Sequence, residues 1–283
     1  MVWYKKYLSI YEKPFSEVPT PVVQEIKEKL AKKQCKEPLV SVIAIAHNEE
    51  QRILSCLWSL ANNSGIDPIE IFVVNNNSTD RTTEVLDAIG IPWLDEKKKG
   101  PGFARQCGLD HAKGKYHLCI DSDTMYPPHY IQTMVNALKQ EDVVAAYGLW
   151  SFIADDKHPK AGLFIYELLR DIHLRIQNIQ RPELCVRGMV FGFRTEQARK
   201  YGFRTDIIRG EDGSLALNLK QEGKLIFVTS RKARALTGNG TLNADGSLFK
   251  SFLARVKKAL RGVCGLFTKK SYYDDGDGSN LIK

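Results

Sequence analysis

The chain has 283 residues and is 43% hydrophobic, which is enough to bury the core of one large α/β domain or two small ones. Its 41 Lys and Arg against 33 Asp and Glu give a formal net charge of +8, which favours an anionic partner such as a nucleotide or an acidic membrane face. We find no basic and aromatic recognition module in the sequence, so we expect no nucleic-acid partner.

The sequence has no run of eighteen apolar residues, its opening MVWYKKYLSI does not resemble a secretory leader, and its six cysteines lack CxxC spacing. These features predict a reduced, cytoplasmic setting.

Strands and helices are expected to alternate along the chain. Residues 1–37 predict a helical lead-in that Pro38 ends, and Ser78 is a candidate helix cap. The alternation predicts an α/β fold with a mostly parallel sheet flanked by helices. The expected strands are 39–46, 69–75, 91–96 and 116–120, and the expected helices are 49–62, 78–89, 103–112, 127–139 and 164–178.

Three polar clusters each follow an expected strand directly. Ligands bind at the carboxyl ends of the strands in such sheets, so we expect the clusters to share one crevice. The clusters are His47–Asn48–Glu49, Asn75–Asn76–Asn77 and Asp121–Ser122–Asp123.

Asp121 and Asp123 offer hard oxygen ligands at one strand end. Such ligands suit Mg²⁺ or Mn²⁺, which commonly bind substrate phosphates as well as protein. The pair therefore predicts one side of a metal–diphosphate clamp. The alternative is an Asp-rich turn that caps the following helix.

The order of motifs resembles the family 2 glycosyltransferases, from about Val40 to about Leu219. The stretches that carry the resemblance are VSVIAIAHNEEQRILSCLWSL, EIFVVNNNSTDRTTEVL, KKGPGFARQCGLDHAKGKYHLCIDSDT and IIRGEDGSLALNL. The resemblance implies a GT-A fold with helical N- and C-terminal extensions. It also implies inverting transfer of a sugar from a UDP- or GDP-sugar to an unknown acceptor hydroxyl, dependent on Mn²⁺ or Mg²⁺, in polysaccharide or glycolipid synthesis.

The resemblance assigns roles to individual residues. Asp121 and Asp123 correspond to the metal motif, and Glu49 would accept hydrogen bonds from the ribose, or else only favour the helix dipole. Asn75 and Asn76 fall at base-reading positions, although Asn-rich loops are also ordinary turns. The implied nucleotide-sugar contacts are His47, Asn48, Glu49, Asn75, Asn76, Gly100, Arg105, Asp121, Ser122, Gly188 and Met189.

Glu211 and Asp212 begin an expected helix whose Leu215, Leu217 and Leu219 should face the core. Inverting transfer requires a general base, and the resemblance implies Asp212, with Glu211 as the fallback. Acids at a helix N-terminus are also favourable without any function.

Two departures from the family pattern leave the metal site open. The expected helix carries Asn218 near a position where the family often has an arginine, and the last histidine is His173. The metal would be held by Asp121, Asp123 and the diphosphate alone, or with a further ligand from residues 237–243. Gly188 and Met189 would line the sugar pocket, or else Gly188 is a packing glycine in a buried strand.

Two other functions stay open at this point. A catalytically degenerate nucleotide-sugar-binding subunit would keep the nucleotide contacts, and a nucleotidyltransferase would share the metal and the basic loop. The latter would need a glycine-rich loop near the chain start, which AIAHNEE does not supply.

We expect three regions: a helical extension over 1–37, a GT-A domain over 38–240, and a basic amphipathic helix with a flexible tail over 241–283. Within the last region, residues 249–270 carry a basic face, and their apolar residues recur at helical spacing. This helix would dock on its own domain, or lie on the inner face of an anionic membrane as a peripheral contact. Its apolar residues are Phe249, Phe252, Leu253, Val256, Leu260 and Val263.

Overall fold

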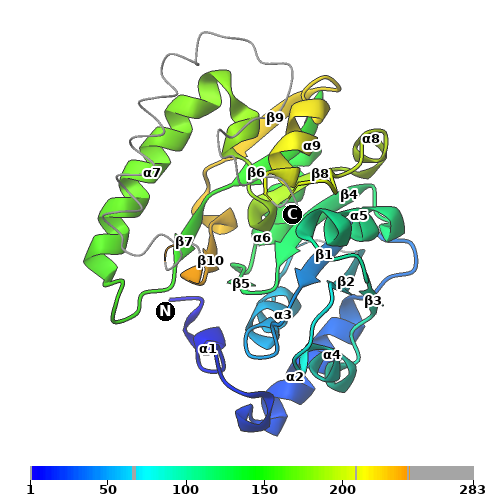
Figure 1. The fold of residues 1–283 in the computed structure, drawn as a ribbon, viewed down its shortest axis with the longest axis vertical. Helices are drawn as coiled ribbons and strands as arrows, with labels where there is room; N and C mark the ends of the chain where they lie inside the picture. The colour runs from blue at the N-terminus through cyan, green and yellow to red at the C-terminus, as the bar shows by residue number, and fades with distance from the viewer. Residues whose placement is uncertain (1, 66–67, 208, 241, 243–283) are drawn as a thin grey trace.

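The computed structural model describes residues 2–65, 68–207, 209–240 and 242. The expected amphipathic helix over 249–270 and the flexible tail lie outside the described residues. The described part forms a central sheet covered by helices on both faces (Figure 1).

The central sheet has seven strands among the described residues, and β1 and β4 lie in its middle. All its pairings are parallel except those of β8, which runs antiparallel to β4 and to β6. The predicted mixed, mostly parallel sheet is therefore confirmed. In spatial order the strands are β3 (Trp93–Asp95), β2 (Ile69–Asn75), β1 (Val40–Ala46), β4 (Tyr116–Asp121), β8 (Phe191–Arg194), β6 (Val143–Gly148) and β9 (Lys224–Val228).

Helices cover the two faces of this sheet, which explains why its inner strands are almost continuously apolar. On one face α5 (Pro101–His111) packs over Ile43, Phe72 and Val74. On the other face lie α2 (Thr20–Lys33), α3 (Ile53–Ala61) and α4 (Thr82–Ile89). Further helices are α1 (Lys5–Leu8), α6 (Tyr130–Leu138), α7 (Lys160–Gln180), α8 (Thr195–Arg199) and α9 (Glu211–Leu219), with 3₁₀ turns η1 (Phe15–Glu17), η2 (Pro182–Cys185), η3 (Gly188–Val190) and η4 (Arg231–Ala233).

The start of α4 differs from the prediction. Ser78 does not cap this helix, because its hydroxyl accepts a hydrogen bond from the Asn48 backbone at 3.0 Å. The Asp80 carboxylate instead accepts from the Thr82 backbone amide at 3.0 Å. A side chain two residues later than expected therefore satisfies one amide of the helix N-terminus.

The N-terminal region is helical, as expected, and it packs into the same core as the sheet. The Tyr7, Ile10, Ile26 and Leu30 side chains are each at most 2% exposed. Residues 2–37 therefore fold against the sheet and its helices, and the loop after α1 reaches the carboxyl end of β4 through Tyr11.

A small second sheet, which the sequence did not predict, closes the carboxyl end of β4. Its middle strand β10 (Ala235–Thr237) pairs antiparallel with β5 (Thr124–Met125) and parallel with β7 (Trp150–Phe152). This pairing places Thr237 beside the Asp121–Asp123 turn.

The described helices include none that is both long and apolar enough to cross a bilayer.

Candidate functional site

The site is centred on Arg105, a buried cation in α5. Its guanidinium is 3% exposed, its Nη1 donates to the Ile120 carbonyl at 3.0 Å, and its Nη2 pairs with the Asp121 carboxylate. Asp121 ends β4, so this one side chain joins α5 to the carboxyl end of β4. The arrangement fixes the orientation of Asp121.

Asp123 lies two residues further on, where β10 covers it. Its Oδ1 accepts hydrogen bonds from the Thr124 hydroxyl at 2.9 Å and from the Thr237 hydroxyl at 3.4 Å. Burial, and then the nearby charge of Asp121, raise the pKa of the Asp123 carboxyl. Asp121 and Asp123 thus place two carboxyl groups close together, and a further cation would stabilise their negative charge.

The residues present fit a divalent cation shared with a phosphate ligand. Asp121 and Asp123 supply hard oxygens, but no cluster of three or more His, Cys, Asp or Glu side chains occurs within the described residues. Of the stretch 237–243, Thr237 reaches Asp123 with its hydroxyl. The protein alone therefore offers too few strong ligands for tight metal binding, and a diphosphate would complete the set.

Glu211 and Asp212 form the first turn of α9, directly after Gly210 in the left-handed region at φ +93°. Asp212 Oδ1 lies 3.6 Å from Arg105 Nε, and neither atom has a hydrogen-bond partner within the described part of the chain. Burial raises the pKa of Asp212, and the Arg105 charge opposes this shift. Burial, and then Asp212, raise the pKa of Glu211 to about 8. The Arg105 guanidinium therefore lies next to both the Asp121 and the Asp212 carboxylates.

The lack of a side chain at Gly188 makes this approach possible. A Cβ at this position would lie 2.2 Å from Arg105 Nη2 and 2.6 Å from Asp212 Oδ2. The next residue, Met189, accepts hydrogen bonds at its carbonyl from the Tyr126 hydroxyl at 3.0 Å and the Tyr130 hydroxyl at 3.4 Å. Tyrosines behind the site therefore fix the backbone that carries Gly188.

Asn76 shapes the basic loop that precedes α5. Its Nδ2 donates to the Glu96 and Lys98 carbonyls at 2.9 and 2.7 Å, and its Oδ1 accepts from the Gly100 amide at 2.9 Å. Its amide group is therefore fully engaged in holding the loop. Asn75 donates to Asp95 at 3.0 Å, and its buried Oδ1 has no partner among the described residues. Of the two candidates for base contacts, Asn75 is the one with a free acceptor.

The His47–Asn48–Glu49 turn lies against the second polar cluster. His47 Nδ1 lies 2.6 Å from the Asn76 carbonyl oxygen, and Asn48 adopts a positive φ of 57°. Glu49 pairs with Arg52 Nε at 2.7 Å. Burial, followed by the Asp123 charge, raises the pKa of Glu49 to about 8, so this side chain belongs to the same electrostatic neighbourhood as the metal motif.

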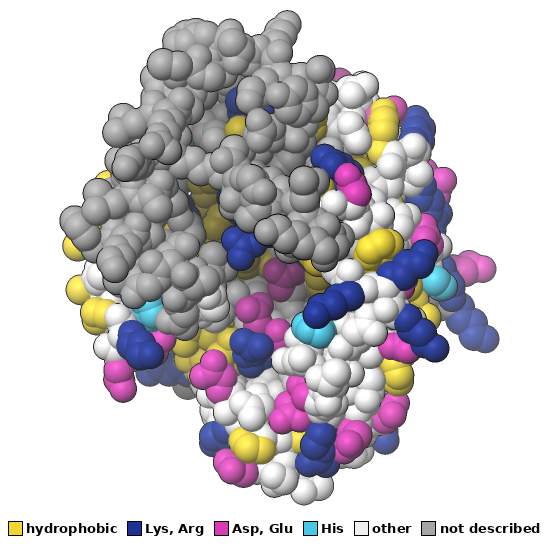
Figure 2. Space-filling view, in the orientation of Figure 1, with side chains coloured by type: hydrophobic (Ala, Val, Ile, Leu, Met, Phe, Trp, Pro, Cys, Tyr) yellow, Lys and Arg dark blue, Asp and Glu magenta, His cyan; other side chains and the backbone are white. Residues whose placement is uncertain are grey.

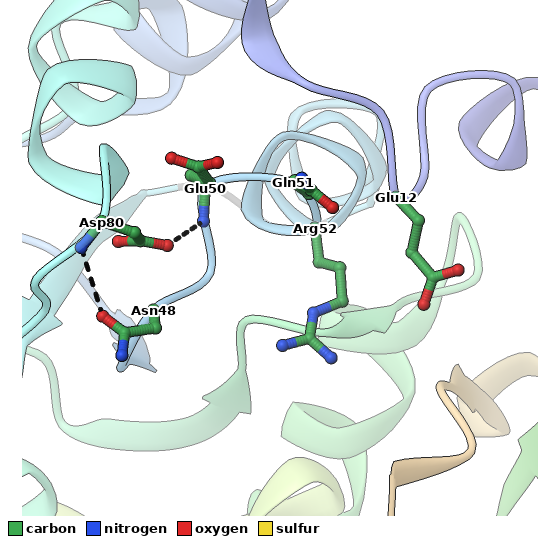
Figure 3. Close-up of a pocket in the computed structure, with 6 residues that line it drawn as sticks. All are labelled: Glu12, Asn48, Glu50, Gln51, Arg52 and Asp80. Carbon is green, nitrogen blue, oxygen red and sulfur yellow. Dashed lines mark hydrogen bonds between the residues drawn. The ribbon is translucent and has the colours of Figure 1, made fainter.

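Figure 3 shows an open hollow of about 470 Å³ at the turn that precedes α3. Six polar side chains line it: Glu12, Asn48, Glu50, Gln51, Arg52 and Asp80. In Figure 2, acidic side chains also gather in a recess near the middle of the face shown. The first two strand-end clusters touch, because His47 Nδ1 lies 2.6 Å from the Asn76 carbonyl oxygen, and in the third cluster Ser122 is buried.

Sequence reasoning missed Tyr11 and Arg52, and it included Thr237 only as one member of the stretch 237–243. The Tyr11 hydroxyl donates to the Asp123 backbone carbonyl at 3.2 Å, and burial, followed by the Asp123 charge, raises its pKa. Arg52 pairs with Glu49, and Thr237 donates to Asp123. Tyr11 and Thr237 come from segments more than a hundred residues away from Asp123, and neither carries a recognisable motif. Only the i, i+3 spacing of Glu49 and Arg52 was a signal that could have been used.

The expectation for α9 was wrong in one detail. Leu215 and Leu219 are buried, but Leu217 is only partly buried and Ala216 fills the core instead. A helix places residues i and i+4 on one face, whereas i+2 points away from it.

Comparison with known proteins supports the fold and the family. The mannosyltransferase PcManGT from Pyrobaculum calidifontis, solved with GDP-Man and Mn²⁺, has a TM-score of 0.58 at 18% identity. The match spans 95% of this chain and 72% of PcManGT. Glucosyl-3-phosphoglycerate synthase from Mycobacterium tuberculosis, solved with Mn²⁺, UDP-glucose and phosphoglyceric acid, has a TM-score of 0.54 at 20% identity and covers 88% and 86%. These likenesses confirm the predicted GT-A fold.

The sequence comparisons reach further than the fold. An uncharacterized glycosyltransferase of Haemophilus influenzae is 30% identical over 228 residues, which are 76% of this chain and 84% of that protein. The family described as Glycosyl transferase family 2 matches residues 41–202. The chain therefore belongs to glycosyl transferase family 2 and is a glycosyltransferase enzyme.

Proposed function

We propose that this enzyme transfers a sugar from a UDP- or GDP-sugar to an acceptor hydroxyl with inversion, and that Asp212 is the general base. The contacts of Arg105 carry the proposal. One buried guanidinium pairs with Asp121 of the metal motif and lies 3.6 Å from Asp212. Acids about ninety residues apart in sequence are thereby placed on either side of one cation, where a donor diphosphate and an attacking hydroxyl would meet.

In the proposed reaction the acceptor oxygen bonds to the anomeric carbon as the bond from that carbon to the diphosphate breaks. The hydroxyl proton goes to Asp212, and the nucleoside diphosphate leaves with the electron pair of the broken bond. Arg105 fixes the positions of Asp212 and Asp121 relative to each other. The absence of a side chain at Gly188 leaves space for Arg105 and Asp212. Glu211 stays the fallback base.

Asp121 and Asp123 would hold Mn²⁺ or Mg²⁺ together with the diphosphate, and the bound ion would stabilise the charge of the leaving group. The basic loop 97–100, shaped by Asn76, and the start of α5 would receive the phosphates through backbone amides other than those of Lys98 and Gly100, which donate to Glu96 and Asn76. GDP-Man and UDP-glucose are bound in solved proteins of this fold, and both donor classes stay in the proposal. A cytoplasmic setting and a place in polysaccharide or glycolipid synthesis belong to the proposal by family analogy.

The test replaces Asp212 with Asn and measures donor binding and nucleoside diphosphate release separately. Loss of a general base should lower turnover by about 100- to 10,000-fold while donor binding is retained. Asp142→Asn is the matched control, because Asp142 is exposed and precedes β6, at the edge of the sheet opposite the carboxyl end of β4. Turnover of Asp212→Asn equal to that of the control would remove Asp212 from the mechanism. A wild-type protein that binds donor without turnover would favour the binding-subunit alternative.

A further inference from the structure

Helix α7 is apolar on its outward face as well as on the inward face, where Leu163, Tyr166 and Leu174 join the core. Among the described residues, nine large hydrophobic side chains are exposed, and seven of them lie on α7. We call these seven residues the α7 apolar face; their side chains are between 40% and 79% exposed. They are Phe164, Ile165, Leu168, Leu169, Ile172, Ile176 and Ile179.

Three charged residues of α7 bond to the protein beside its buried apolar residues. Glu167 accepts from the Ser151 hydroxyl at 2.7 Å and from the Phe152 amide at 2.8 Å. Arg170 donates to the Trp150 carbonyl, and Asp171 pairs with Arg234. A surface helix normally places its apolar stripe on the core and its charges in water, so the outward face of α7 is built for an apolar cover.

The positions of these residues form one continuous stripe. At 100° per residue, the α7 apolar face occupies an arc of about 140° along the length of the helix, and Arg175 is the one charged residue within this arc. The exposed charged side chains of α7 are Lys160 and Arg175, and its acids are turned inward. Hydrophobic side chains are visible at the left margin of Figure 2, where α7 stands in Figure 1.

We propose that the C-terminal segment 249–263 of the same chain packs on the α7 apolar face through Phe249, Phe252, Leu253, Val256, Leu260 and Val263. These residues recur at helical spacing, so in a helix about 22 Å long they would form one apolar stripe. An apolar stripe matches the apolar face of α7. With this face on α7, the lysines and arginines of the segment point to solvent.

The course of the chain supports this occupant over others. Asn239, near the end of the described residues, donates to the Ile153 carbonyl at 2.6 Å and to Asp155 at 2.7 Å, just before α7 begins at Lys160. Phe249 follows Asn239 by ten residues, which span up to about 33 Å, and α7 is about 31 Å long. The segment can therefore reach any part of α7. Tethering gives it an effective concentration in the millimolar range, which favours it over a second copy.

The test is hydroxyl-radical footprinting of the full chain, which reads the solvent accessibility of the α7 side chains. In the wild type, Phe164, Leu168 and Ile172 should react slowly, and Val256→Asp should raise their oxidation severalfold. Lys258→Asp is the matched control, because a helix would place Lys258 opposite the apolar stripe; it changes the charge more but should leave the α7 rates unchanged. Equal α7 oxidation in the wild type and in Val256→Asp would overturn the proposal.

A reciprocal experiment guards against an indirect effect of Val256→Asp. Ile172→Asp places a charge at an exposed position of α7 and should speed tryptic cleavage after Lys257 and Lys258. Cleavage at the wild-type rate would contradict docking. Protection of α7 that appears only with phosphatidylglycerol vesicles would assign the face to lipid, and protection that grows with protein concentration would assign it to a second copy; either result would overturn the proposal.

Discussion

Gly188→Ala tests whether the approach of Arg105 and Asp212 is needed for catalysis. The added Cβ would lie 2.2 Å from Arg105 Nη2 and 2.6 Å from Asp212 Oδ2, whereas ordinary contacts begin near 3.4 Å. One or both side chains must therefore move by about 1 Å. Arg105 is 3% exposed and bonded to Ile120 and Asp121, so its displacement disturbs the metal motif too.

A shift of this size in a catalytic group lowers the rate by about 100-fold, which corresponds to about 2.7 kcal/mol of activation free energy. We expect Gly188→Ala to show this loss in nucleoside diphosphate release. The overpacking should also lower the free energy of unfolding by about 1 to 3 kcal/mol, measured by denaturant unfolding.

Gly148→Ala is the matched control. Gly148 is also buried, but its Cβ would meet its nearest neighbours at 3.5 Å or more, which is ordinary contact. Gly148→Ala should therefore keep near wild-type turnover. If Gly188→Ala turns over as fast as Gly148→Ala, the packing of Arg105 against Asp212 has no part in the reaction.

Two further predictions concern loop shape and pH. Asn76→Ala should lower the free energy of unfolding by about 1 to 3 kcal/mol and weaken nucleotide binding, because the Gly100 amide loses its hydrogen-bond acceptor. Asn136→Ala is the control: Asn136 is at an exposed position of α6, and its replacement should change neither quantity. An unchanged affinity in Asn76→Ala would separate the loop from the donor site. Burial, followed by the Asp212 charge, raises the pKa of Glu211 from 4.5 to about 8; Asp121 adds to this shift and Arg105 opposes it. Between these two pH values Glu211 keeps its proton in the folded state and loses it in the unfolded state. The free energy of unfolding therefore falls as the pH rises through this range. Glu211→Gln should flatten this fall by up to about 1.4 kcal/mol per pH unit, and an unchanged slope in pH-dependent denaturation would contradict it.

The sheet and its polar edge could be predicted because they depend on local patterns. Buried parallel strands read as apolar runs, and β1, β2 and β4 lie where those runs occur. The predicted grouping of polar residues at the carboxyl ends of the strands follows from the same alternation of strands and helices.

The small sheet and several side chains of the site could not be predicted, because they depend on contacts between segments distant in sequence. Strands of two or three residues, such as β5 and β10, are too short to carry a period, so the small sheet and the position of Thr237 could not be predicted. Tyr11 reaches Asp123 only because the N-terminal helices pack on the domain core. Asn75 and Asn76 look alike in sequence, but the register of β2 against β3 gives one a side-chain partner and the other three backbone partners.

Calorimetric titration with UDP and with GDP, each with and without Mn²⁺, tests the metal–diphosphate clamp most directly. The wild type should bind one of these nucleotides tightly only when Mn²⁺ is present, and Asp123→Asn should lose this metal-dependent binding while staying folded. Binding that ignores Mn²⁺, or that survives Asp123→Asn unchanged, would contradict the clamp at Asp121 and Asp123.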